Sequence, residues 1–136
     1  MKRELILENR IEELDALTVF VQTCGEEWQL ATEVVFNLQL ALEECVTNVI
    51  MYAYPPQEKH TLRVTAEWQQ PDLRFTIEDS GVPFDPTQVA EADTSLSAEE
   101  RPIGGLGIFL VRRLMDSVEY RREGKKNLLT LRKRVE

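Results

Sequence analysis

Two polar residues one helical turn apart, Glu44 and Asn48, are the first candidates for chemistry in this sequence. A spacing of four places both side chains on the same face of a helix. A carboxylate beside an amide oxygen suits a hard cation with oxygen ligands, or a general base beside a metal-bound phosphate. Taken alone, the spacing is more often that of an ordinary pair of surface residues, so both interpretations stay open.

The second candidate is the triplet Asp79-Ser80-Gly81, which follows a run of alternating apolar and polar residues. A carboxylate at the end of a strand can accept a hydrogen bond from an exocyclic amine, and the glycine lets a ligand approach the backbone. Aspartate and glycine are also standard turn residues, so an ordinary strand-ending turn is the alternative.

The third candidate is the stretch Gly104-Gly105-Leu106-Gly107, directly before a predicted helix. Three glycines in four residues let backbone N–H groups point at an anion, and a helix N-terminus favours negative charge. The spacing is neither that of a dinucleotide fingerprint nor that of a P-loop with its lysine. A flexible hinge is the alternative, but residues 85–103 form a long acidic loop that leads into the glycines and could act as a lid.

The elements that must position these residues follow from the hydrophobic pattern. Leu5-Ile6-Leu7 indicates a short strand, and residues 9–24 have the three- and four-residue spacing of a helix that Gly25 would end. A second helix is predicted over residues 33–53, with Thr32 as its N-cap. Glu44 and Asn48 therefore flank the apolar stripe of the second helix.

The second half of the chain is predicted to be mainly extended. Residues 62–69 and 73–78 alternate as the two strands of an antiparallel hairpin. A third helix is expected after Gly107, and two more strands at about 117–122 and 128–134. This order predicts an α+β fold: a two-layer sandwich with three helices on one face of a mixed, mainly antiparallel sheet.

Size and charge limit the kind of protein. We expect residues 1–136 to form a single domain, because the hydrophobic fraction of 43% can supply one core. The net charge of −8 should repel nucleic acid, so no direct nucleic-acid partner is expected. The sequence shows neither a secretory signal nor an uninterrupted apolar run of about 20 residues, so we expect no membrane segment and a cytoplasmic location.

In combination, the three motifs resemble the GHKL ATPases, which include gyrase, heat-shock chaperone, histidine kinase and mismatch-repair ATPases. These proteins carry an E-x-x-x-N helix, then D-x-G, then a glycine-rich lid segment, as this chain does in the same order. The flanking residues narrow the resemblance to the anti-sigma factor serine/threonine kinases. They are residues 40–48, 52–54, 79–86, 104–111 and 114–116.

The resemblance implies a role for each motif residue. Glu44 would be the general base that activates the acceptor hydroxyl, and Asn48 would hold Mg²⁺ against the triphosphate of ATP. Asp79 would bind the adenine amine, with Gly81 lining the base pocket. Such roles fit phosphoryl transfer, which depends mainly on positioning and on charge neutralisation.

The resemblance also covers the predicted lid. The stretch Gly104-Gly105-Leu106-Gly107 would contact the phosphates as the lid closes, and Arg101 would reach the γ-phosphate. Two positions depart from the family: Tyr52 stands where a histidine is frequent, and Lys126-Asn127-Leu128 stands where relatives commonly place a threonine near the base. The resemblance therefore leaves open what supports the adenine at that last position.

The function that the resemblance implies is an ATP-dependent protein serine/threonine kinase that acts as an anti-sigma factor. It would phosphorylate an anti-anti-sigma-type partner, bind a sigma factor and form a homodimer. One alternative is a catalytically silent, ATP-gated protein-binding module. The presence of Glu44 favours the kinase over this alternative. Another is a detached histidine-kinase domain, but the single histidine, His60, precedes a strand and not a phosphoacceptor helix.

Overall fold

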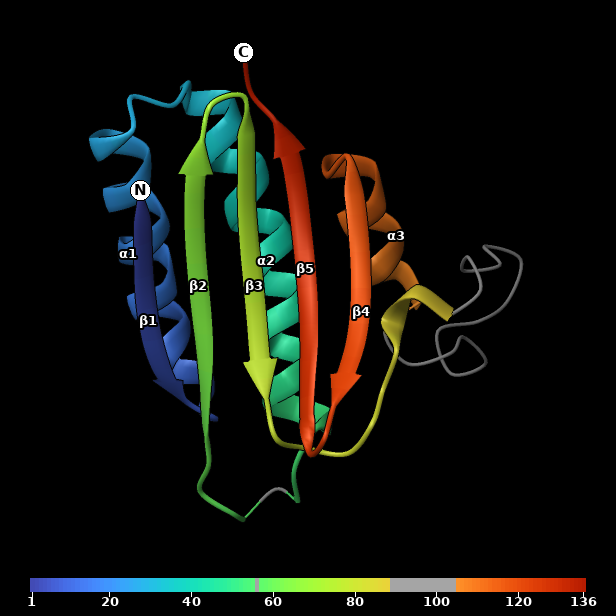
Figure 1. Cartoon of the computed structure of the whole chain (residues 1–136). Coiled ribbons are helices and arrows are strands. Elements are labelled where there is room, and N and C mark those ends of the chain that lie inside the picture. The colour runs from blue at the N-terminus through green and yellow to red at the C-terminus, as the bar shows by residue number, and fades with distance from the viewer. Residues whose placement is uncertain (56, 89–104) are drawn as a thin grey trace.

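A computed structural model describes residues 1–55, 57–88 and 105–136. It contains one antiparallel sheet with its helices packed on a single face (Figure 1). In chain order the elements are β1 (Lys2–Glu8), the short 3-10 helix η1 (Ile11–Glu13), α1 (Leu14–Glu27), α2 (Thr32–Tyr52), β2 (Thr61–Gln69), β3 (Asp72–Asp79), the short 3-10 helix η2 (Pro86–Gln88), α3 (Gly105–Leu114), β4 (Ser117–Glu123) and β5 (Lys126–Arg134).

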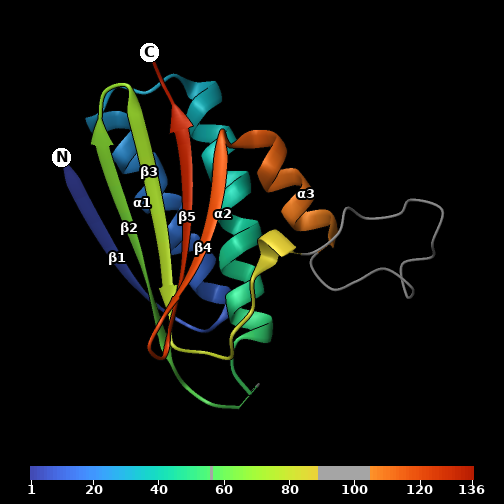
Figure 2. The same ribbon diagram turned by 45° about the vertical axis from the view of Figure 1, so that its right-hand side comes forward.

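The strands of the described residues lie in the order β1-β2-β3-β5-β4. Every neighbouring pair of strands is antiparallel. The prediction of a mixed sheet is therefore wrong in this detail. The chain reverses direction three times between β1 and β2, at the turns from β1 to α1, from α1 to α2 and from α2 to β2, so the two neighbouring strands run in opposite directions. The predicted α+β sandwich is confirmed, because α1, α2 and α3 all lie behind the same face of the sheet (Figure 2).

The core lies between α2 and the central strands. The alternation predicted for the hairpin is confirmed, since the odd positions of β3 are buried and the even positions of β2 are buried as far as Ala66, with Trp68 partly buried. Phe75 is fully buried, and the α2 residues Leu38, Leu42 and Cys45 are buried against the sheet. Removing each such large side chain from water contributes about 1.5–3 kcal/mol to stability.

The helix α2 has the length and apolar composition of a membrane span, although its sequence pattern does not predict one. Its apolar stripe is already occupied, because Leu42 and Val46 are fully buried in the core of this domain. Length and composition are therefore weak evidence that α2 crosses a membrane.

The end of α1 differs from the prediction at Gly25. The helix continues past this glycine to Glu27, and the left-handed residue that ends it is Gln29, with a φ of 54°. The amide of Leu30 donates to the carbonyl of Gly25 at 2.9 Å, as in a Schellman motif. Gly25 is buried instead against Val35, where a Cβ atom would lie 2.5 Å from a Val35 methyl carbon. This glycine lets α1 and α2 approach each other.

Two helix starts also differ from the prediction. Thr32 is the first residue of α2 and not its N-cap; the cap residue is Ala31, and no side chain caps the helix. The helix α3 begins at Gly105, so Gly105 and Gly107 lie within its first turn and not before it. The glycine-rich motif is therefore partly helical.

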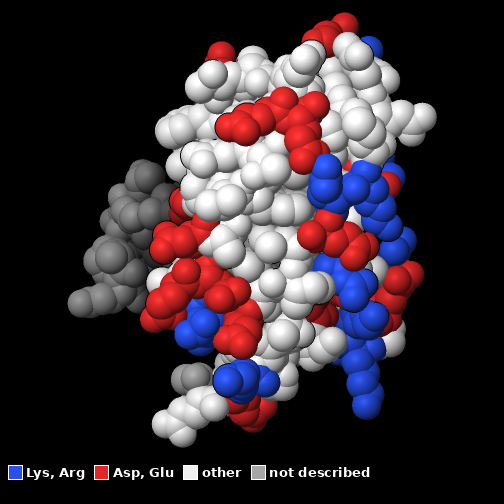
Figure 3. Space-filling model, turned by 90° about the vertical axis from the view of Figure 1, so that its left-hand side faces the viewer, with Lys and Arg blue, Asp and Glu red and all other residues white. Residues whose placement is uncertain are grey.

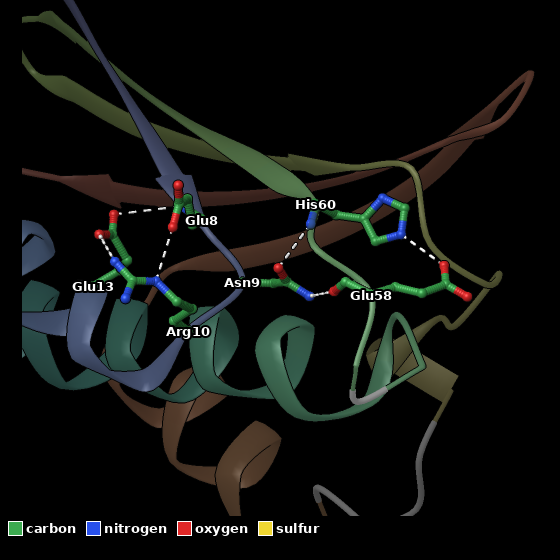
Figure 4. Close-up of polar contacts among 6 residues, drawn as sticks. All are labelled: Glu8, Asn9, Arg10, Glu13, Glu58 and His60. Atoms are coloured by element: carbon green, nitrogen blue, oxygen red, sulfur yellow. Dashed lines mark hydrogen bonds and ion pairs between the residues drawn. The ribbon is translucent and has the colours of Figure 1, made fainter.

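A polar cluster ties the end of β1 to the loop before β2 (Figure 4). The side chain of Asn9 accepts a hydrogen bond from the amide of His60 and donates one to the carbonyl of Glu58, both at 2.8 Å. On the other side, Arg10 pairs with Glu8 at 2.8 Å. The cluster fixes the loop that follows α2.

The contact between Gly25 and Val35 gives a stability prediction. Gly25→Ala should destabilise the domain by about 1–3 kcal/mol, because the added methyl group overpacks the α1–α2 contact. This loss should outweigh the helix propensity that alanine gains over glycine, about 1 kcal/mol. Urea denaturation of Gly25→Ala, Val35→Ala and the double variant tests it. The double variant should be more stable than the two single losses predict, and strictly additive losses would contradict the close contact.

Candidate functional site

A pocket of about 750 Å³, part of it open to solvent, lies between α2, α3 and the ends of the central strands. Its walls are mainly apolar, with a few polar groups, which is the usual character of a small-molecule site. The lining residues are Cys45, Asn48, Val49, Tyr52, Ala53, Ile77, Asp79, Val82, Pro83, Phe84, Pro86, Ile108, Val111, Tyr120, Asn127 and Leu129. Two predicted site residues, Asn48 and Asp79, thus line one pocket.

Asp79 is buried at the end of β3, with only 6% of its surface exposed. Its Oδ1 atom accepts a hydrogen bond from the amide of Gly81 at 2.8 Å. Gly81 in turn packs against the end of α2, where a Cβ atom would lie 2.3 Å from the carbonyl oxygen of Ala53. The amide of Val82 donates to that same carbonyl at 3.0 Å. A glycine is required here because the two backbones are in contact.

Tyr54, just after the end of α2, contacts the turn that follows β3. Its hydroxyl oxygen accepts a hydrogen bond from the amide of Ser80 at 2.7 Å, and its ring stacks on His60 at 3.9 Å between centroids. Burial raises the pKa of Tyr54 above its usual value, and the negative charge of Asp79 raises it further. The phenol of Tyr54 therefore stays neutral. The side chain of Asn9 accepts a hydrogen bond from the amide of His60 and so fixes the residue on which the Tyr54 ring stacks.

Glu44 lies beside the pocket, against the first turn of α3. A Cβ atom on Gly107 would lie 2.5 Å from Oε2 of Glu44, so only glycine fits at this position without a shift of the carboxylate. The positive end of the α3 dipole favours a carboxylate at this place. The structure thus brings Glu44 and Gly107 together from two different helices.

The two cysteines, Cys24 and Cys45, are buried and free. Cys45 lines the pocket, but burial raises the pKa of its thiol to about 12, and the charge of Glu44 adds to the shift. The thiol is therefore neutral at physiological pH and is a poor nucleophile.

Part of the predicted phosphate segment is described. Gly105 and Leu106 open α3, whereas Arg101 and Gly104 lie outside the described residues, as does most of the predicted lid. At the start of the lid, Asp85 accepts a hydrogen bond from the amide of Thr87 at 2.9 Å. Arg112 of α3 donates to the carbonyl of Thr87, which attaches this start to α3.

The sequence assigned no role to three residues at the site, although it marked Lys126-Asn127-Leu128 as a departure from the family. Asn127 is as buried as Asp79, and its side-chain amide donates to Oδ1 of Asp79 at 2.9 Å. The hydroxyl of Tyr120 and the guanidinium of Arg122 donate to the side-chain oxygen of Asn127. One signal was present in the sequence: Asn127 begins the apolar alternation of Leu129 and Leu131, and a polar residue on a buried face of a strand needs partners.

Comparison with known sequences places this geometry in a family. The model of the histidine kinase-like ATPase domain matches residues 7–133. Serine/threonine-protein kinase BtrW of Bordetella bronchiseptica is 29% identical over 71% of this chain and 68% of its own length. Serine-protein kinase RsbW of Listeria monocytogenes is 31% identical over 72% of this chain and 66% of its own. Anti-sigma F factor of Clostridium perfringens is 25% identical over 73% and 71%.

Solved structures agree on the fold. The histidine kinase domain of a blue-light activated kinase from Erythrobacter litoralis EL346 superposes with a TM-score of 0.57, at 17% identity. The match covers 90% of this chain and 61% of that one. At this identity the likeness concerns the fold alone, so the assignment to a family rests on the sequence matches. The chain belongs to the histidine kinase-like ATPase domain family, on the branch of the anti-sigma factor serine kinases.

Proposed function

We propose that this chain is an ATP-dependent protein serine/threonine kinase that acts as an anti-sigma factor. It transfers the γ-phosphoryl group of ATP to a serine or threonine of an anti-anti-sigma-type protein, and it binds a sigma factor. The names of the relatives, serine-protein kinase and anti-sigma F factor, support both parts of the proposal. A cytoplasmic role in transcription regulation follows from these partners.

The observation that carries the proposal is the order of groups along α2. Ala53 holds the turn with Asp79 and Gly81, Asn48 lies further back along the helix, and Glu44 lies one turn beyond Asn48. At 1.5 Å per residue, positions 44 and 53 are about 13.5 Å apart along the helix axis. A nucleotide with its base near Asp79 would extend its phosphates towards Glu44.

The base end of the pocket fits adenine. Ile77, Ile108 and Leu129 offer apolar surface, and Asp79 is an acceptor-only group when ionised. The exocyclic amine of adenine is a donor that such a carboxylate can bind, whereas the carbonyl oxygen at the same position of guanine is not. Asp79 would thus help to hold the nucleotide and would favour adenine over guanine.

Magnesium would be held by Asn48 together with the phosphates of the nucleotide. No group of three or more His, Cys, Asp or Glu residues that could hold a metal occurs among the described residues. Mg²⁺ sites of phosphoryl-transfer enzymes commonly use one or two protein ligands and the substrate phosphates, so a single amide oxygen in this pocket fits. When bound, the ion would neutralise the charge of the phosphates.

Glu44 supplies the base for the transfer step. Its carboxylate takes the proton of the acceptor hydroxyl as the hydroxyl oxygen forms a bond to the γ-phosphorus. The bond from that phosphorus to the β–γ bridging oxygen breaks, and ADP leaves. The close contact with Gly107 keeps the carboxylate at the first turn of α3, beside the pocket that contains Asn48.

Replacement of the base tests the kinase directly. Glu44→Gln keeps the size of the side chain but removes the proton acceptor, so phosphotransfer should fall by about 10² to 10⁴ while ATP affinity changes little. Radiolabelled ATP and a panel of anti-anti-sigma-type proteins measure the rate, and calorimetry measures the affinity. Glu43→Gln, on the neighbouring residue of the same helix, is the matched control and should transfer at the wild-type rate.

Two results would change the assignment. A Glu44→Gln variant that transfers phosphate at the wild-type rate shows that another group is the base. A wild-type protein that transfers nothing to any partner, while ATP alters its affinity for that partner, shows an ATP-gated binding module and not a kinase.

The role of Asn48 is tested by metal dependence. Asn48→Ala should weaken ADP binding in the presence of Mg²⁺, because the protein ligand of the ion is lost, and should leave the weaker binding measured in EDTA nearly unchanged. Calorimetry with and without Mg²⁺ provides both values. An equal loss of affinity under the two conditions would mean that Asn48 contacts the nucleotide itself or supports the pocket.

We also propose that the chain forms a homodimer through the side made by β1 and α1. In the part of the chain that the structure describes, β1 is an edge strand that pairs with β2 on one side, and such edges readily add another strand. Next to it runs a groove whose lining includes the apolar residues Leu5, Ala16, Val19 and Phe20 together with Arg3 and Glu4. Figure 3 shows an area without charge between charged borders on this side of the molecule. Val19 is 61% exposed, so a dimer that covers the groove would remove this apolar side chain from water.

A charge in this groove should separate the subunits. Val19→Glu places a carboxylate in the proposed interface, so the dimer should dissociate at least tenfold more readily in sedimentation equilibrium. Phe36→Glu changes an equally exposed apolar residue on α2, away from the groove, and serves as the control. A wild-type protein that is monomeric at high micromolar concentration would end the proposal of a dimer.

A further inference from the structure

Three strands contribute one residue each to a row of polar side chains at the base end of the pocket. In the strand register, Asp79 of β3 is opposite Asn127 of β5, and Asn127 is opposite Arg122 of β4. Residues directly opposite each other in antiparallel strands have side chains close enough to interact. The row lies beneath the turn that carries Gly81, and Tyr120 reaches it from two positions earlier on β4.

The hydrogen bonds of this row determine which way the amide of Asn127 faces. Its Oδ1 atom accepts from the hydroxyl of Tyr120 and from Arg122, the latter at 3.1 Å. Arginine has donors only, so the amide oxygen and not the amide nitrogen must face Arg122, and the hydroxyl of Tyr120 donates to the same oxygen. The NH₂ group is thereby directed to the other side, towards Asp79.

Both hydrogens of that NH₂ group have an acceptor. Nδ2 lies 2.9 Å from Oδ1 of Asp79 and 2.9 Å from the carbonyl oxygen of Val82. Asn127 therefore has no donor left for a ligand. Within residues 1–55, 57–88 and 105–136, the hydrogen bonds that Asp79 accepts from Gly81 and Asn127 both end on Oδ1, so Oδ2 is the acceptor that remains for a molecule in the pocket.

Arg122 also connects the row to the backbone of the turn. Its NH1 group donates to the carbonyl of Gly81 at 2.9 Å as well as to Asn127. One guanidinium group thus holds the turn and the amide at the same time. The orientation of the Asp79 carboxylate depends on both.

We infer that Asn127, oriented by Tyr120 and Arg122, is a positioning and specificity-determining residue for the purine base of the nucleotide. It holds Oδ1 of Asp79 so that Oδ2 points at the position-6 substituent of the base. Because its own donors are occupied, the site offers only an acceptor there, and it selects a 6-amino purine over a purine without the amine. This inference rests on the proposed binding of ATP and adds residues that the motif pattern does not contain.

The test compares two ligands that differ only at position 6. ADP carries the amine, and purine riboside 5′-diphosphate has hydrogen in its place. A hydrogen bond to an ionised group should make wild-type protein bind ADP about ten- to hundredfold more tightly than the analogue. Asn127→Leu, which has a similar volume but no donor, should lose most of this preference, with ADP weakened and the analogue little changed.

A second variant keeps the amide but removes the groups that orient it. Tyr120→Phe combined with Arg122→Leu frees the amide to turn, so the preference for ADP should again fall severalfold. These two residues are only half-buried, so this variant tests the inference even if Asn127→Leu fails to fold. Arg121→Gln, on the exposed face of the same strand, is the matched control and should keep the wild-type preference.

The outcomes separate this inference from the proposed function. If wild-type protein binds neither nucleotide, the proposed ATP binding itself is wrong. If wild-type protein prefers ADP and the Asn127 and Tyr120/Arg122 variants keep the same ratio, or lose both ligands equally, the row is only structural and the inference is overturned.

Discussion

The contact between the end of α2 and the turn after β3 is the constraint on which the site depends. Gly81 and Ala53 approach so closely that a single added carbon atom would collide with the carbonyl of Ala53. The hydrogen bond from Val82 to that carbonyl connects the same two backbones. The contact fixes where α2 ends on the sheet, and the earlier positions of the helix, Asn48 and Glu44 among them, follow from it. The distance between Asp79 and Glu44 follows from this contact and the rise of a helix.

A buried carboxylate adds a second constraint. Removing an ionised group from water is costly unless hydrogen bonds replace the lost hydration. Asp79 meets this requirement because it accepts hydrogen bonds from the amide of Gly81 and from the side chain of Asn127. The side-chain oxygen of Asn127 in turn accepts a hydrogen bond from Arg122. The network has to be nearly complete, because a half-satisfied polar group in a low-dielectric interior weakens the fold. Stability and ligand recognition therefore depend on the same hydrogen bonds.

How much could be predicted from the sequence depends on the range of the interaction. The alternating strands of the hairpin and the apolar stripe of α2 are local patterns, and they identified both elements and the face of each. The prediction that Gly25 ends α1 was wrong because a glycine in a helix can either end the helix or let a second helix approach. Only the position of Val35 in the fold shows which of the two applies. The contact of Gly107 with Glu44 likewise joins two helices, and no local rule reveals it.

Asn127 is the clearest case of a long-range effect at the site. It is paired with Asp79 only because β5 inserts between β3 and β4, which brings together residues from opposite ends of the second half of the chain. The motif pattern identifies Asp79 and Gly81, the two residues that we propose contact the ligand. It does not contain Asn127, Tyr120 or Arg122, which orient the carboxylate of Asp79. A short motif can identify such contacts because they are few and near in sequence. The groups that orient them depend on strand order, so they have to be read from the sheet.

The packing of α2 also explains why its site residues need little further ordering. Glu44 and Asn48 flank a stripe in which Leu42 and Val46 are fully buried, so the helix cannot rotate without breaking the core. The stripe fixes the direction of the two side chains, the Ala53–Gly81 contact fixes the helix along its axis, and Gly107 fixes the carboxylate of Glu44 from the opposite side. Groups held in this way lose little conformational freedom when a substrate binds, which is the condition for efficient catalysis by positioning. The described part of the fold therefore presents the two ends of the proposed nucleotide site at a set separation before any ligand arrives.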